Sequence, residues 1–217
     1  MRKSLVNEGL FLPVDQQNPG DGSFVFLRAN LWSPSYEVLA IEGYPGFHAG
    51  KINLILATLN TGEPFLLAAA HGASTNAADG RLQVSLITEV FYKLCQEEKY
   101  ADLQLLIGTD ANTKTEGDVE NLHQHLENLG LVGTKVKGPT TLKRRMVTVQ
   151  HSKAGKWAID NEDFIITLAP ENGGKYLLTN PTVDFKSEPP SLTRMLPDRN
   201  NPSDHYPVGA TLQAYKP

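Results

Sequence analysis

The chain has 217 residues, of which 40% are hydrophobic and 20% are charged, as is typical of one globular domain with a substantial core. Its net charge of −4 excludes a global positive field of the kind that drives tight nonspecific binding to nucleic acid. The single cysteine, Cys95, excludes an internal disulfide and fits a reducing compartment. Because no apolar run reaches the length of a signal-peptide core or a membrane span, we expect a cytoplasmic protein without a transmembrane segment.

The first third of the chain is expected to form strands and loops. Short apolar runs there alternate with clusters of proline, glycine and asparagine, which is the pattern of strands joined by turns. In chain order we expect an arm or loop over residues 1–22 ahead of a domain over 23–217, a strand over 23–29, strand and loop over 32–51, and a hairpin of strands 52–59 and 64–71 around a turn at 60–63.

Two amphipathic helices are expected among the remaining strands. The first spans 81–98 with Asp79 as its N-cap, and the second spans 119–128 and stops at Gly130. The apolar face of the first helix would consist of Leu82, Leu86, Val90 and Leu94, at spacings of four. The other elements are strands over 103–110, 140–150, 164–166 and 206–214, with a loop over 186–202 before the last strand. Hairpins mixed with helical crossovers predict an α/β protein with a mixed sheet.

Polar side chains stand at four of the predicted strand ends. Asp110 and Asn112 follow the apolar run at 103–108, and side chains two apart at the end of a strand point to the same side. The other clusters are His71, Asp163 and the tripeptide Ser203-Asp204-His205. Taken singly, residues of these types are more often turn residues or hydrogen-bonded surface residues than catalytic ones.

Taken together, these clusters contain what metal-dependent hydrolysis of a phosphate ester requires. Carboxylate oxygens hold Mg²⁺, a hard cation, which neutralises charge on the phosphoryl oxygens and stabilises the leaving group. An aspartate can orient or deprotonate water, and a second aspartate can fix the tautomer of a histidine. Asparagine and histidine donate hydrogen bonds to phosphate.

The order of four motifs resembles that of a known superfamily. The sequence reads H-G-A-S from His71, G-T-D-A-N from Gly108, D-F-I-I from Asp163 and S-D-H-Y-P-V from Ser203, and this order is similar to that of the endonuclease/exonuclease/phosphatase superfamily. The resemblance covers residues 23–214. It implies an α/β (α+β) fold, a four-layer α/β/β/α sandwich of two mixed sheets with helices outside.

The resemblance also implies roles for individual residues. Asp110 would orient or activate the attacking water, Asn112 would contact the scissile phosphate, and His205 would stabilise the transition state while held by Asp163. His71 would be a second phosphate contact. The implied metal residues are Asp204 and Asp110, for Mg²⁺ or Mn²⁺, and Thr140, Lys143 and Arg144 would join Asn112 on the substrate side.

One unit of the superfamily pattern has no match in this sequence. Members of the superfamily open with a strand carrying Asn, a helix, and a strand ending in Gln-Glu, whose Glu is the main metal ligand. Asn30, Glu8 and Glu42 lack the right context for these roles, so we expect an N-terminally truncated form of the fold.

Two functions follow from the sequence. The first is a divalent-metal-dependent phosphoesterase with phosphodiesters as its expected substrates. The alternative is a catalytically impaired fragment or pseudo-enzyme that binds a phosphate-containing ligand or a protein partner without turnover. The substrate class stays open among nucleic acid, inositol phosphate and phospholipid headgroup, since loops determine specificity in such folds.

Overall fold

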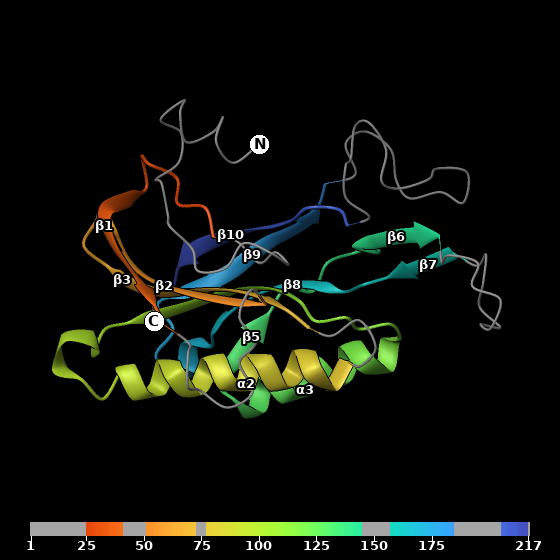
Figure 1. Cartoon of the computed structure of the whole chain (residues 1–217), viewed down its shortest axis with the longest axis horizontal. Helices are drawn as coiled ribbons and strands as arrows, with labels where there is room; N and C mark the ends of the chain where they lie inside the picture. The colour runs from red at the N-terminus through yellow and green to blue at the C-terminus, as the bar shows by residue number, and fades with distance from the viewer. Residues whose placement is uncertain (1–24, 41–50, 73–76, 145–156, 185–204, 217) are drawn as a thin grey trace.

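A computed structural model of the chain describes residues 25–40, 51–72, 77–144, 157–184 and 205–216. These residues form three layers, with a six-stranded sheet in the middle, two α-helices on one face and a two-stranded sheet on the other (Figure 1). No helix of the described residues is both long and apolar enough to cross a bilayer.

The central sheet is mixed. Its strand order is β1-β2-β3-β4-β8-β5, and β3 and β4 form a parallel pair while their neighbours pair antiparallel. The strands are β1 (Trp32–Leu39), β2 (Ile52–Leu59), β3 (Pro64–His71), β4 (Gln104–Asp110), β5 (Leu131–Gly133) and β8 (Asp163–Leu168). The parallel register brings the C-terminal ends of β3 and β4 to the same edge of the sheet, next to the start of β8.

Two small antiparallel sheets complete the fold. The pair β9 (Tyr176–Val183) and β10 (Val208–Ala214) packs against β8 of the central sheet. The pair β6 (Thr141–Arg144) and β7 (Trp157–Asp160) projects beyond the end of the central sheet (Figure 1). Two short 3₁₀ helices, η1 (Glu98–Tyr100) and η2 (Pro170–Asn172), lie in the connections.

The two α-helices make the connections that follow β3 and β4. Helix α2 (Ala77–Leu94) joins these two strands, and α3 (Glu116–Asn128) joins β4 to β5. Helix α3 begins after Thr115, whose Oγ1 accepts a hydrogen bond from the Asp118 N–H at 3.1 Å and so satisfies one N-terminal donor. It ends before Gly130, which has φ +74°, as glycine allows at this position.

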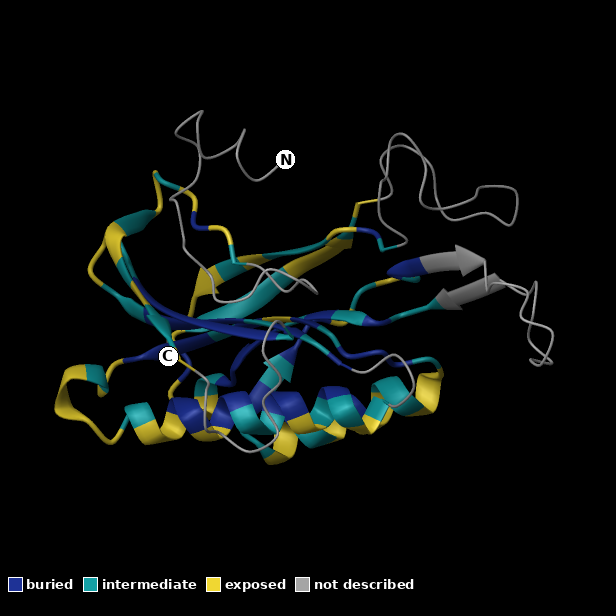
Figure 2. Ribbon diagram, viewed as in Figure 1, coloured by how far each residue is buried: buried dark blue, intermediate teal, exposed yellow. Residues whose placement is uncertain are grey.

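Buried side chains form one cluster on each face of the central sheet, and Figure 2 marks the buried residues along its strands in dark blue. The larger cluster lies between the sheet and the helices and includes Ile87 and Leu105, both fully buried. The smaller cluster lies on the other face, where the Phe65 ring is 5.6 Å from Tyr176 of β9 and 5.5 Å from Trp32 of β1. Apolar side chains on both faces explain why β2 and β3 are nearly continuous apolar runs.

The predicted α/β class and its mixed sheet are confirmed. The hairpin of β2 and β3 and the strand ending at Asp110 lie where they were predicted. The described residues supply three of the four expected layers, and their second sheet is a purely antiparallel pair. Residues 1–24, which include the expected arm, and the loop over 186–202 lie outside the described residues.

Other local predictions were wrong. Residues 25–27 form no strand, and a turn follows in which the Leu31 and Trp32 N–H groups donate to the Arg28 carbonyl. Strands β5 and β9 were not predicted. Helix α3 begins three residues earlier than expected, and Asp79 lies inside the first turn of α2 instead of capping it.

The buried face of α2 also differs from the predicted one. Leu82 is 50% exposed, and the buried positions include Val84, Ile87 and Phe91. Successive steps of four residues advance 400°, so a row at that spacing drifts by about 40° per step around the helix. A face that stays against the sheet must therefore alternate steps of three and four.

Candidate active site

Three neighbouring strands present polar residues at the same level of the central sheet. His71 at the end of β3 is paired with Asp110 at the end of β4, and Asp110 is paired with Asp163 at the start of β8. Directly opposed side chains on paired strands share a face of the sheet. Asp110 is four residues after Leu106, which packs in the cluster on the face away from the helices, so the three polar side chains belong to that face.

The Asp110 carboxylate lies between two imidazoles. Its Oδ2 is 3.5 Å from His71 Nε2 and 3.6 Å from His205 Nε2, and its Oδ1 accepts a hydrogen bond from the Asn112 N–H at 2.9 Å. Burial raises the pKa of Asp110 to about 6, and the negative charge of Asp163 adds to the rise. A carboxyl group that titrates near neutral pH is suited to accept and release protons.

His205 is held by side-chain and backbone contacts. Its Nδ1 lies 2.8 Å from Asp163 Oδ2 and 3.3 Å from Thr141 Oγ1. Its backbone forms a bridge with Thr141, and the next N–H, that of Tyr206, donates to the Thr140 carbonyl at 2.7 Å. With a proton on Nδ1 engaged by the carboxylate, the ring presents Nε2 toward Asp110. The side chain is 25% exposed, so solvent and ligands can reach it.

Asn112 joins the ends of β3 and β4. It is 2% exposed, and its Nδ2 donates a hydrogen bond to the Gly72 carbonyl at 2.8 Å. Its φ of +51° is left-handed, a conformation that asparagine tolerates better than most residues. The side chain therefore positions the two strand ends, and the predicted phosphate contact would use its other N–H.

The predicted substrate-side residues take different places. Thr140 is fully buried, and its hydroxyl accepts hydrogen bonds from the Glu162 and Asp163 N–H groups at 2.9 and 3.0 Å. It supports the start of β8 instead of facing a substrate, because both contacts occupy its hydroxyl oxygen. Lys143 and Arg144 belong to β6, but their side chains lie outside the described part of the chain, as does all of Asp204.

Sequence reasoning missed Glu162. This residue is fully buried, its Oε2 accepts a hydrogen bond from Thr141 Oγ1 at 3.1 Å, and its carbonyl accepts from the Ala111 N–H at 2.7 Å. An acidic residue directly before Asp163 was the available signal. A sequence does not show that the short link between β7 and β8 brings the Glu162 carboxylate to the same centre as Asp110.

The donor chemistry of this centre fits a divalent metal. Asp110, Glu162 and His205 each offer one ligand atom, and these atoms lie within 4.8 Å of one another. Carboxylate oxygens suit Mg²⁺ and Mn²⁺, and an imidazole nitrogen suits the transition metals. Of the two metal residues that the resemblance implied, Asp110 belongs to this group.

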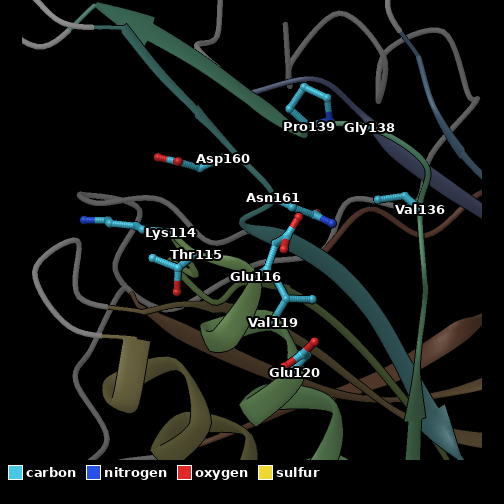
Figure 3. A pocket seen from close by; sticks show the side chains of 10 residues that line it. All are labelled: Lys114, Thr115, Glu116, Val119, Glu120, Val136, Gly138, Pro139, Asp160 and Asn161. Atoms are coloured by element: carbon cyan, nitrogen blue, oxygen red, sulfur yellow. The ribbon is translucent and has the colours of Figure 1, made fainter.

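A pocket of 560 Å³ is lined by residues close in sequence to the site, although none of the site residues lines it. Lys114 and Asn161, two of the residues that line it, are each two residues away from Asn112 or Asp163, and the Thr113 hydroxyl donates to the Asn161 carbonyl. Figure 3 shows side chains from the start of α3, from the end of β7 and the link to β8, and from the segment after β5 around the pocket. Its charged lining residues are Lys114, Glu116, Glu120 and Asp160.

Solved structures of other proteins share this architecture. The chain is similar to D. rerio TDP2 complexed with single strand DNA product, with 14% identity over 98% of this chain and 81% of that chain and a TM-score of 0.56. It is also similar to truncated Caenorhabditis elegans TDP2, with 14% identity over 98% and 78% of the two chains and a TM-score of 0.57.

A third similar structure supplies the name of the fold. It is an endonuclease/exonuclease/phosphatase family protein from Bacteroides thetaiotaomicron, with 13% identity over 86% of this chain and 66% of that chain and a TM-score of 0.51. This chain has the endonuclease/exonuclease/phosphatase fold. No protein-family model matches its sequence, and no curated protein matches it either. In this endonuclease/exonuclease/phosphatase fold, the cluster around Asp110 occupies the strand ends of the central sheet.

Proposed function

We propose that this chain is a divalent-metal-dependent phosphoesterase that hydrolyses phosphodiester bonds. The observation that carries the proposal is the convergence of Asp110, His205 and Asp163. Nε2 of His205 lies 3.6 Å from the Asp110 carboxylate, while its Nδ1 lies 2.8 Å from the Asp163 carboxylate. These residues come from distant parts of the sequence. If each were only a turn residue at the end of its own strand, their side chains would have no reason to converge.

The geometry supports a division of labour between the two carboxylates. Asp110, with its pKa raised to about 6, takes the proton from the attacking water. Asp163 holds His205 with Nε2 toward the reaction volume and stabilises the ring when it carries a positive charge. The charged ring donates a hydrogen bond to a phosphoryl oxygen as negative charge develops there. A bound divalent cation would further neutralise the phosphoryl oxygens.

Among the three substrate classes, we favour nucleic acid, because the similar D. rerio TDP2 was solved with a single-stranded DNA product.

The test is hydrolysis of bis(p-nitrophenyl) phosphate with Mg²⁺ or Mn²⁺, measured against an EDTA control. We expect metal-dependent turnover that falls by about 10²–10⁴-fold in His205→Ala. His125→Ala is the matched control, because the His125 ring contacts Ser85 of α2, away from Asp110. Turnover that persists in EDTA, or that His205→Ala leaves intact, would contradict the proposal. A folded chain without turnover would favour the pseudo-enzyme alternative.

A further inference from the structure

We propose that Glu162 is a metal ligand of this site and acts with Asp110, beside the His205 ring. The inference rests on the proposed function, because it names the residues of this chain that would hold the metal of that reaction. It also gives the site a carboxylate that sequence reasoning did not identify.

The side chains at this centre lie close enough together to surround one ion. One ligand atom from each of the three residues lies within 4.8 Å of the others. Ligand atoms at about 2.0–2.2 Å from one ion are separated by about 3 Å when adjacent and by about 4 Å when opposed. The carboxylates of Asp110 and Glu162 therefore need only small rotations to share one ion. They come from the end of β4 and from the link between β7 and β8, so the folded sheet brings them together.

The negative charge gathered at this site also favours a cation. Glu162 is fully buried, and a buried carboxylate is costly unless positive charge or hydrogen bonds compensate it. Asp110, Glu162 and Asp163 together carry up to three negative charges, which the imidazoles of His71 and His205 offset only when protonated. A divalent cation among these carboxylates would offset their mutual repulsion.

Hydrogen bonds hold Glu162 in place. The Thr141 hydroxyl donates to Glu162 Oε2 at 3.1 Å and lies 3.3 Å from His205 Nδ1. The Glu162 N–H donates to the buried Thr140 hydroxyl at 2.9 Å. Groups that hold metal ligands in place commonly affect metal affinity by about 10–100-fold. Thr141 therefore orients the Glu162 carboxylate and also contacts the His205 ring beside it.

The test measures metal binding without substrate. Free Mn²⁺ is followed by electron paramagnetic resonance during titration of the full chain, in the wild type, Glu162→Gln and Glu89→Gln. The amide of Glu162→Gln would keep an oxygen acceptor for Thr141 but lacks the charge. Glu89 is the matched control, because it is a 59% exposed glutamate on α2 that pairs with Lys93. We expect Mn²⁺ binding to weaken at least tenfold in Glu162→Gln and to stay within about twofold of wild type in Glu89→Gln.

Two results would overturn the inference: wild-type affinity in Glu162→Gln, or no saturable Mn²⁺ binding by the wild type. If circular dichroism shows that Glu162→Gln is unfolded, Thr141→Val is titrated instead. We expect it to bind Mn²⁺ about tenfold more weakly, and unchanged affinity would likewise overturn the inference. Hydrolysis of bis(p-nitrophenyl) phosphate is measured separately. Binding without turnover would reject the proposed function alone, and turnover with unaltered binding in Glu162→Gln would reject the Glu162 assignment alone.

Discussion

Catalysis requires the ionised form of the Asp110 side chain, and this form lowers the free energy of unfolding. Its pKa is raised from 3.8 to about 6 by burial, so the folded chain keeps a proton that the unfolded chain releases between those values. The contribution of Asp110 to the free energy of unfolding is therefore greatest at low pH and falls as the pH rises through about 6. Above that pH, the ionised carboxylate costs roughly 3 kcal/mol.

We expect Asp110→Asn to raise the free energy of unfolding by about 1–3 kcal/mol at pH 8 in EDTA. Asparagine keeps the oxygen that accepts the Asn112 N–H and removes the charge. The difference from wild type should shrink toward zero at pH 4, and urea denaturation at both pH values measures it. Asp102→Asn is the control, because the Asp102 side chain is 81% exposed. A less stable Asp110→Asn at pH 8 would show that the carboxylate is stabilised in the fold.

The sequence identified some site residues and missed others for physical reasons. Asp110 and His71 end recognisable apolar strands, so their place at a sheet edge follows from the pattern alone. Glu162 lies in the two-residue link between β7 and β8, whose path depends on tertiary hydrogen bonds to Thr140 and Ala111. Thr140 was expected to face a substrate. The sequence alone does not reveal whether a threonine hydroxyl faces solvent or accepts hydrogen bonds from two buried N–H groups.

At the scale of elements, helix α2 sets the position of the strand end that follows it. A Cβ atom added to Gly80, in the first turn of α2, would lie 2.5 Å from the Ala111 carbonyl oxygen and 2.8 Å from the Ala111 Cα. Ala111 stands between Asp110 and Asn112. The absence of a side chain at Gly80 thus lets the helix approach the backbone of the site.

We expect Gly80→Ala to be destabilising and to lower metal-dependent turnover, because the helix or the 110–112 backbone must move. In an unobstructed helix the same change stabilises by about 0.5–1 kcal/mol. Gly117→Ala in α3 is the matched control, since a Cβ there meets only the Thr115 hydroxyl at 3.8 Å. Urea denaturation and phosphodiester hydrolysis of both variants measure the effect. Equal behaviour of the two variants would show that the contact with Ala111 imposes no constraint.

Strands were predicted correctly where a local sequence pattern specifies them. They were missed where pairing with another strand specifies them. Strands β2, β3 and β4 are apolar runs bounded by turn residues, and they were found. Strand β5 has only three residues and exists because it pairs with β8. Strand β9 alternates weakly, and its burial depends on β10 and on the central sheet. Short or half-exposed strands of this kind are specified by pairing more than by composition.

At the scale of the molecule, the two faces of the central sheet pack against different elements. The helix side buries the larger cluster, whereas the other side supports β9 and β10. His205 lies three residues before β10, so the packing of that pair against the central sheet determines where the imidazole lies. Phe65 is the side chain at the middle of this packing, in contact with Tyr176 of β9 and Trp32 of β1.

Truncating one large side chain on each face separates stability from positioning. Phe65→Ala should lower the free energy of unfolding by about 3–5 kcal/mol, and Leu126→Ala on α3 by about 2–5 kcal/mol, because both residues are at most 1% exposed. At a low temperature where both variants remain folded, we expect Phe65→Ala to lose metal-dependent turnover and Leu126→Ala to keep most of it. The Phe65 cavity loosens β9 and, through β10, the approach of His205 to Asp110. Equal loss of turnover in both variants would mean that global destabilisation alone controls activity.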